Sequence, residues 1–152
     1  MKPATGHHID LAKINLAFSI AEAAFYKKKD LSGKPYFGHL DRIAQKVDTV
    51  DQKVIAYLHD LVEDFPEAYS VEELRHLFRD HITDSILLLT HRKEERYGEY
   101  IEKIMNSGNQ DAIAVKIADL EDNMDLTRLN EINEKDISRL KKYHAAWSSL
   151  KT

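Results

Sequence analysis

With 152 residues, of which 43% are hydrophobic and 32% charged, the chain is long enough to bury a core as one domain. It has no cysteine, which excludes disulfides and thiolate metal ligands, so a bound metal must use histidine and carboxylate groups. The formal net charge of -4 gives no electrostatic reason to expect long nucleic acids as partners, although local basic groups could hold a small phosphorylated ligand. No apolar run approaches a membrane span or a signal-peptide core, so we expect a cytoplasmic protein without membrane contact.

The first part of the chain predicts two helices joined by a loop. An amphipathic helix begins at about residue 9 and is expected to end in the three lysines at 27–29, because cations complement the negative end of a helix dipole. The segment 30–35 is typical of a loop by its glycine and proline. A second helix is predicted over 36–47 and carries His39.

The third predicted helix, over 51–65, carries an unusual group of polar side chains. His59 and Asp60 are adjacent, and Glu63 and Asp64 follow four residues later. On a helix His59 would lie over Glu63 and Asp60 over Asp64, so four groups that bind metals or transfer protons share two neighbouring rows. Such groups repel one another without a positive charge between them, which favours a divalent metal. The alternative is a solvated acidic face with His59 at its edge.

The rest of the chain also predicts helices. Three are expected over 70–78, 81–89 and 97–105, one over 112–120, and a last one that reaches Leu150. No segment shows convincing strand alternation. We therefore expect an all-α fold of seven or eight helices.

The helix over 112–120 is apolar nearly all the way round and should be buried. Lys116, Asp119 and Asn123 fall on one line of this helix. A buried lone carboxylate is costly unless it is paired or coordinates a metal. Asp119 is therefore expected either to form a salt bridge with Lys116 or to bind a metal.

Together these residues form the pattern H…HD…D, and here the chain resembles the HD-domain metal-dependent phosphohydrolases. Residues 33–39, GKPYFGH, resemble the G-x-P-Y-x-x-H of the RelA/SpoT-type and metazoan SpoT-homologue hydrolases of guanosine 3′,5′-bis(diphosphate), or ppGpp. HDLVED at 59–64 is similar to their H-D-x-V-E-D, and VKIAD at 115–119 with Asn123 to their V-K-x-A-D-x-x-x-N. The resemblance covers about residues 10–147 and implies a single HD-domain helical bundle over 1–152.

The resemblance implies a site and a reaction. The metal ligands would be His39, His59, Asp60 and Asp119, around one divalent ion. Mn²⁺ is favoured, and such ligands also accept Mg²⁺, Fe²⁺, Co²⁺, Zn²⁺ or Ni²⁺. Glu63 and Asp64 would position or deprotonate the attacking water. The expected substrate contacts are Asn123, Lys27, Lys28, Lys116, Arg139 and Tyr143. The implied activity is hydrolysis of the 3′-pyrophosphate of a ppGpp-like nucleotide through a metal-activated water.

Two segments depart from the family pattern. The family commonly has an arginine or lysine before the first ligand that clamps the purine, and here only Lys27 or Lys28 could substitute, without the planar guanidinium that stacks on a base. The usual R-L-H-N is Leu120-Glu121-Asp122-Asn123, which predicts a more acidic rim.

Two other functions stay open at this point. The altered base-recognition segment favours a nucleotidase, or a phosphatase acting on a dinucleotide such as NADPH. A third interpretation is an HD module that binds nucleotide without turnover, although the complete set of ligands and the Glu63-Asp64 pair argue against it.

Overall fold

The computed structural model describes the backbone of residues 5–152 and the side chains of residues 8 and 10–152; residues 1–4 of the expected domain lie outside this part. The described chain is helical and contains no β-sheet. Its helices are α1 (Thr5–Ala24), α2 (Phe37–Lys46), α3 (Val50–Leu58), α4 (Leu61–Asp64), α5 (Val71–Leu77), α6 (Asp80–Leu88), α7 (Tyr97–Asn106), α8 (Gln110–Asn123) and α9 (Glu134–Lys151), with a 3-10 turn, η1 (Leu126–Arg128). Because α4 is a single turn of 4 residues, the predicted all-α fold of seven or eight longer helices is confirmed.

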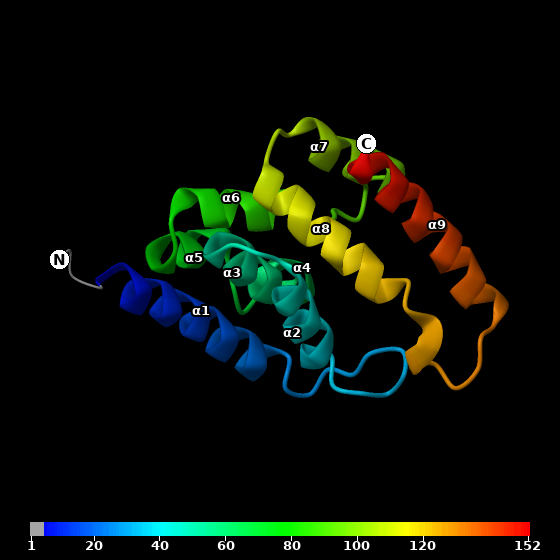
Figure 1. Cartoon of the computed structure of the whole chain (residues 1–152), viewed down its shortest axis with the longest axis horizontal. Helices are drawn as coiled ribbons and strands as arrows, with labels where there is room; N and C mark the ends of the chain where they lie inside the picture. The colour runs from blue at the N-terminus through cyan, green and yellow to red at the C-terminus, as the bar shows by residue number, and fades with distance from the viewer. Residues whose placement is uncertain (1–4) are drawn as a thin grey trace.

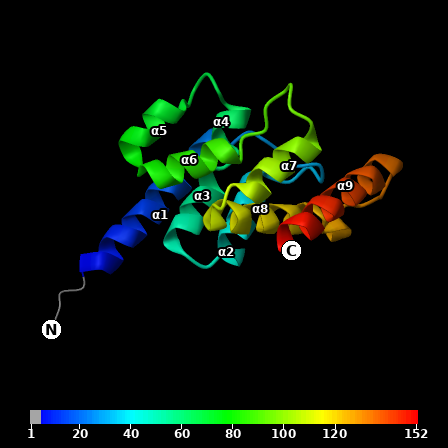
Figure 2. The ribbon, with the colours of Figure 1, turned by 90° about the horizontal axis from the view of Figure 1, so that it is seen from above.

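Helix α3 lies at the centre of the hydrophobic core. It packs against α1, α2, α6 and α8, and its residues from Val54 to Leu58 are all buried. Figures 1 and 2 show α8 crossing the middle of the molecule with α9 alongside it. The residues that follow α3 therefore emerge inside the protein, between α2 and α8. Within residues 5–152, the helices are too short or too polar to cross a bilayer.

The predicted third helix is interrupted at the His59-Asp60 pair. Helix α3 ends at Leu58 and α4 begins at Leu61. The ring nitrogen Nδ1 of His59 lies 2.7 Å from the carbonyl oxygen of Ala56, which in an uninterrupted helix would accept from the amide of Asp60. Asp60 has φ -95° and ψ -4°, which opens the turn. The rows expected on one straight helix are therefore broken between Asp60 and Leu61.

Helix α1 ends earlier than the sequence predicts. It stops at Ala24, and the lysines at 27–29 belong to a loop over 25–36. The chain folds back on itself there, since the amide of Tyr36 donates to the carbonyl of Lys28 at 2.9 Å. Gly33, at φ +81°, makes the reversal, a conformation that favours glycine. This loop forms one wall of the cavity described below.

Thr49 caps α3, and its replacement by alanine is expected to lower stability. The amide of Gln52 donates to Thr49 Oγ1 at 3.1 Å, and the Gln52 side chain accepts in return from the Thr49 amide. We expect Thr49→Ala to lower the free energy of unfolding by about 1 kcal/mol, measured by urea denaturation. Ser149→Ala, on the exposed surface of α9, should change it by less than about 0.5 kcal/mol. An unchanged urea midpoint for Thr49→Ala would contradict this role of the cap.

Candidate metal centre and adjoining cavity

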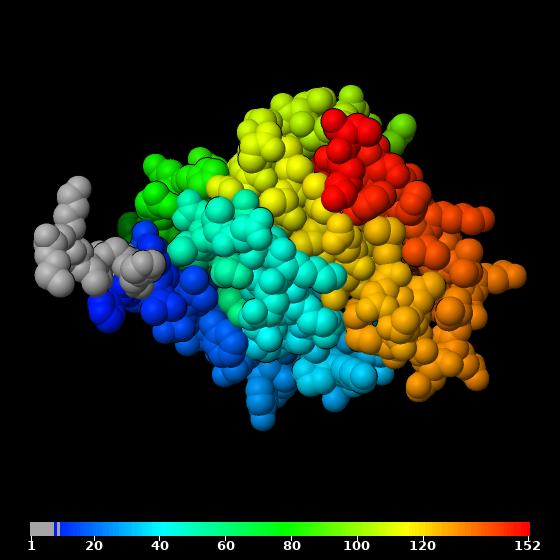
Figure 3. Space-filling model, viewed as in Figure 1, coloured from blue at the N-terminus to red at the C-terminus, as the bar shows by residue number. Residues whose placement is uncertain are grey.

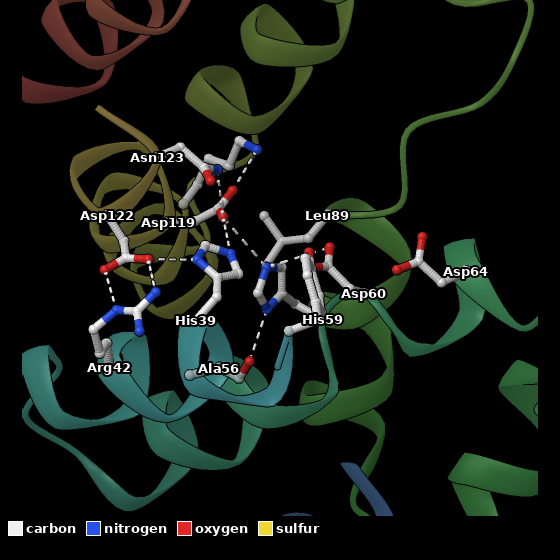
Figure 4. A network of polar contacts seen from close by, with 12 residues as sticks. His39, Arg42, Ala56, His59, Asp60, Asp64, Leu89, Asp119, Asp122 and Asn123 are labelled. Carbon is white, nitrogen blue, oxygen red and sulfur yellow. Dashed lines mark hydrogen bonds and ion pairs between the residues drawn. The ribbon is translucent and has the colours of Figure 1, made fainter. Parts of the chain in front are cut away.

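The four predicted metal ligands meet where α2, the α3–α4 junction and α8 come together (Figure 4). Nε2 of His39 lies 3.0 Å from Oδ1 of Asp119, and Nε2 of His59 lies 3.8 Å from the same oxygen. Nε2 of His59 is also 3.4 Å from Oδ1 of Asp60. Ligand atoms about 2.1 Å from one ion and at right angles to each other lie about 3 Å apart. His39, His59 and Asp60 offer ligand atoms that all lie within 4.8 Å of one another, and Asp119 Oδ1 adjoins both histidines, so the cluster has the dimensions of a candidate metal centre.

The hydrogen bonds of His59 leave one of its nitrogens without a donor or acceptor partner. Its side chain is 2% exposed, and Nδ1 is paired with the Ala56 carbonyl, so Nδ1 carries the proton and Nε2 carries a lone pair in the neutral ring. Nε2 is buried and forms no hydrogen bond with any residue that the structure describes. Its nearest neighbours are the carboxylates of Asp60 and Asp119, which cannot donate. A lone pair facing two carboxylates needs a cation between them, and a divalent ion fits this set.

His39 also has its Nδ1 paired, but its Nε2 lies 3.0 Å from Oδ1 of Asp119, within hydrogen-bond distance. Its Nδ1 lies 2.6 Å from Oδ2 of Asp122, which places the proton on Nδ1 and leaves Nε2 directed at Asp119. Burial alone would lower the pKa of His39, but its hydrogen bonds to Asp119 and Asp122 raise that pKa to about 9. The pocket therefore favours a positive charge at this position, which a proton or a metal ion can supply.

Asp119 divides its two oxygens between the metal centre and Lys116. Oδ2 accepts from Lys116 Nζ at 2.8 Å, while Oδ1 faces the histidines and accepts from Asn123 Nδ2 at 3.1 Å. The salt bridge to Lys116, one of the two alternatives for Asp119, is thus present, while Oδ1 stays directed at the histidines. Lys116 and the histidines hold the pKa of the Asp119 carboxyl well below its usual range, against the effect of burial.

Lys116, which was expected to contact substrate, is placed away from the cavity. Its side chain is buried, with Nζ at Asp119 and 5.3 Å from the centre of the Tyr100 ring. It does not line the cavity beside the metal centre. A buried carboxylate needs a cationic partner, and Lys116 supplies that charge instead of binding a ligand.

Asp122 was not among the predicted site residues, yet it contacts a proposed metal ligand and two arginines. It is 1% exposed and accepts from His39, from Arg42 Nε at 2.8 Å and from Arg128 Nη2 at 3.3 Å. These partners hold the pKa of Asp122 far below its usual range, although burial opposes the shift. The neighbouring Glu121 accepts from Trp147 Nε1 at 3.0 Å. The acidic rim predicted from 120–123 is therefore largely buried or paired.

A straight helix would place Glu63 beside His59 and Asp64 beside Asp60. In the structure, the side chains of Glu63 and Asp64 contact other residues. Glu63 Oε1 accepts from the backbone amide of His91 at 2.6 Å, and the side chain keeps access to solvent. Desolvation by its neighbours and the charge of Asp60 raise the pKa of Glu63. Asp64 forms an ion pair with Lys28 and stands apart from the His–Asp cluster in Figure 4. The break before α4 therefore removes the two straight rows that were expected, and Asp64 is directed at Lys28 instead of at Asp60.

A cavity of about 320 Å³ adjoins the metal centre on the side of His39. Its walls come from the 25–36 loop, from η1 and the residues around it, and from the start of α9, segments that meet at the lower edge of the space-filling view in Figure 3. The size is in the range of small-molecule sites. Cationic and polar side chains in its lining include Lys28, Lys29, Arg42, Arg128, Arg139, Asn123 and Tyr143.

The structure brings most, but not all, of the predicted substrate contacts to this cavity. Asn123, Lys28, Arg139 and Tyr143 line it. Lys27 does not: it is exposed and lines a separate hollow on the other side of the loop. Lys28 is committed to Asp64, with Nζ also 4.1 Å from the centre of the Tyr36 ring. Lys27 and Lys28 take these positions because α1 ends at Ala24, so the two lysines do not continue the helix that the sequence predicted.

A second His–Asp group, formed by Asp51, His81 and Asp111, has a structural explanation. The three residues lie in the first turns of α3, α6 and α8, where the helix dipoles stabilise carboxylates. Asp51 pairs with Arg79 at 2.7 Å, and Asp111 pairs with His81 at 2.7 Å. These ion pairs account for the three side chains without a metal.

No protein-family model matches the chain, and no curated protein sequence matches it. Among solved structures, the chain is similar to a metazoan orthologue of SpoT that hydrolyses ppGpp and plays a role in starvation responses. The TM-score is 0.73, the alignment covers 99% of this chain and 88% of that one, and the sequence identity is 19%. The likeness establishes the fold, and the predicted resemblance to the SpoT-type HD-domain hydrolases is confirmed at that level.

Proposed function

We propose that the chain is a metal-dependent phosphohydrolase that removes the 3′-pyrophosphate of a ppGpp-like nucleotide. The unpartnered Nε2 of His59, buried between two carboxylates, is the observation that carries this proposal. Four ligand groups on three different helical segments converge there, beside a cavity with several cationic side chains. The shared fold with a ppGpp-hydrolysing protein supports the same reaction.

His39, His59, Asp60 and Asp119 would hold the ion. When bound, a divalent metal supplies positive charge to a phosphate oxygen and lowers the pKa of a coordinated water. Glu63 is the best-suited proton acceptor among the neighbouring carboxylates, because its pKa is raised and its side chain reaches solvent, where the proton can leave. Asp64, which pairs with Lys28 apart from the cluster, would instead hold the 25–36 loop against α4.

The cavity supplies groups for the rest of the nucleotide. Arg139 pairs with Asp136 through one nitrogen only, so its remaining donors are available to a phosphate. Asn123 lies between Asp119 and the cavity and can reach the ribose or its phosphate while it steadies the ligand. Tyr143 lines the same wall.

The proposal is tested with purified protein, ppGpp and Mn²⁺. We expect release of pyrophosphate, detected enzymatically, with GDP as the other product by ion-exchange chromatography. The reaction should stop with excess EDTA and recover when Mn²⁺ is restored. No turnover of ppGpp with Mn²⁺, Mg²⁺, Co²⁺ or Zn²⁺ would overturn the assignment of substrate.

A second function, phosphate removal from another nucleotide such as NADPH, is favoured by the lining of the cavity. Lys27 lies outside it and Lys28 is paired with Asp64, so neither is free to clamp a purine. Instead the cavity offers the aliphatic residues Leu31, Leu126 and Leu129, which pack on a base without reading its edges. A nucleotide panel scored for phosphate against pyrophosphate separates the two functions.

Replacing Glu63 tests its role as proton acceptor. Glu63→Gln keeps an oxygen for the His91 amide but cannot accept a proton, so we expect kcat to fall about 10²-fold with little change in metal affinity. Glu67→Gln, exposed on the surface just beyond α4, is the matched control and should retain full activity. Activity of Glu63→Gln within twofold of the parent would show that another group accepts the proton.

A further inference from the structure

Helices α2 and α8 meet with two residue pairs in matching register. His39 and Arg42 lie three residues apart on α2, and Asp119 and Asp122 lie three residues apart on α8. Residues at this spacing share a helix face, and the two helices pack against each other. The first pair therefore faces the second. His39 contacts both aspartates, and Arg42 contacts Asp122.

We propose that Asp122 is a positioning residue that fixes the imidazole of His39 with Nδ1 protonated and Nε2 directed into the metal centre. This proposal rests on the proposed metal-dependent function. The contact from Asp122 Oδ2 to Nδ1 is 2.6 Å, and both side chains are almost fully buried. Without this carboxylate, Nδ1–H would be buried without an acceptor, and the ring could turn to offer that proton to Asp119 instead. Carboxylates behind metal-binding histidines orient the ring and increase its basicity.

The two arginines hold Asp122 in place. Arg42 donates through Nε to Oδ1 at 2.8 Å and through Nη2 to Oδ2 at 3.1 Å, a two-point contact that fixes the plane of the carboxylate. Arg128 Nη2 adds contacts to the backbone carbonyl of Asp122 at 2.8 Å and to Oδ2 at 3.3 Å. Both arginines also line the cavity. Asp122 stands where the RelA/SpoT-type motif carries a histidine, so this arrangement is a feature of the chain itself.

Calorimetric titration with Mn²⁺ on the full chain tests the proposal. We expect Asp122→Ala to weaken Mn²⁺ binding 10- to 100-fold, the usual effect of removing such a partner. Asp122→Asn keeps a carbonyl that can accept from Nδ1–H, so its loss should be smaller. Glu121→Gln, one residue away with the same change in charge, is the control and should bind Mn²⁺ like the parent. Parental affinity in a folded Asp122→Ala protein, or equal losses in the alanine and asparagine variants, would overturn the proposal.

A measurement on the unaltered protein covers the case in which the Asp122 variants do not fold. Long-range ¹H–¹⁵N spectra of the Zn²⁺-loaded protein report which imidazole nitrogen carries the proton, and the signals of His39 are those lost in His39→Asn. We expect Nδ1 to be protonated and Nε2 to be bound to Zn²⁺; the opposite assignment would refute the positioning role. Neither measurement uses a substrate, so a negative ppGpp assay would leave this result unaffected.

Discussion

Replacing Asp60 with asparagine is expected to lower kcat/KM at least about 10³-fold, because the loss of one anionic ligand removes several kcal/mol of metal-dependent charge stabilisation. Asparagine keeps the size of the side chain and an oxygen that can accept the hydroxyl of Tyr36, which now donates to Asp60. Asp60 is also partly accessible, with 15% of its side chain exposed, so its replacement should not unfold the core. Initial rates on ppGpp at saturating Mn²⁺, together with Mn²⁺ titration calorimetry, measure the effect.

The matched control for Asp60→Asn is Asp84→Asn. Asp84 pairs with Arg75 at 2.6 Å on the surface of α6, and 58% of its side chain is exposed. Exposed ion pairs contribute little to stability, so this variant should keep parental activity and metal affinity. Circular dichroism of both variants verifies that the fold is retained. Asp60→Asn with activity within tenfold of the parent and unchanged Mn²⁺ affinity would remove Asp60 from the metal centre.

Three of the four proposed metal ligands carry local signals in the sequence, whereas His39 was indicated by the resemblance to the HD-domain hydrolases. An adjacent His59-Asp60 pair follows a buried helix, and Asp119 sits on a helix that is apolar nearly all round, so both must enter the interior. The capping box at Ser70 is another local signal, and the structure has it with Glu73 as the partner. These features involve neighbours within a few residues. Hence local patterns predicted the fold class, whereas the expectation that His39 joins His59, Asp60 and Asp119 came from the resemblance to the HD-domain hydrolases.

The contacts that could not be predicted from the sequence join segments that are far apart along the chain. The ion pair of Lys28 with Asp64 joins residues 36 positions apart, and the contact of His39 with Asp122 joins residues 83 apart. Helix propensity favours extending α1 through the lysines. The chain instead reverses direction at Gly33, and backbone hydrogen bonds between the two arms of the 25–36 loop stabilise this reversal. The matching three-residue spacings of 39–42 and 119–122 are the one signal that could have indicated Asp122, provided that the packing of α2 on α8 was known.

The metal-free protein is expected to lose stability as the pH rises from about 6.5 to 9. His39 has an ordinary pKa of 6.5, and its pKa in the folded protein is about 9. A group with a raised folded pKa contributes stability that is complete below the unfolded pKa and is lost as the pH passes through the folded pKa. The difference corresponds to a loss on the order of 3 kcal/mol in the free energy of unfolding. The pKa of His59 is also raised, because the nearby carboxylates outweigh its burial, so its contribution has the same sign.

Urea denaturation in EDTA at a series of pH values measures this loss, and the same series with Mn²⁺ gives the opposite trend. A metal ion competes with protons for Nε2 of His39 and His59, so the stabilisation by Mn²⁺ should increase over the same interval. His144→Gln, which alters an exposed histidine of α9, should reproduce the parental pH profile, whereas His39→Gln should flatten it. If the metal-free protein were equally stable at pH 6.5 and pH 9, the two imidazoles would not be held among carboxylates in solution, and the proposed cation site would have no basis.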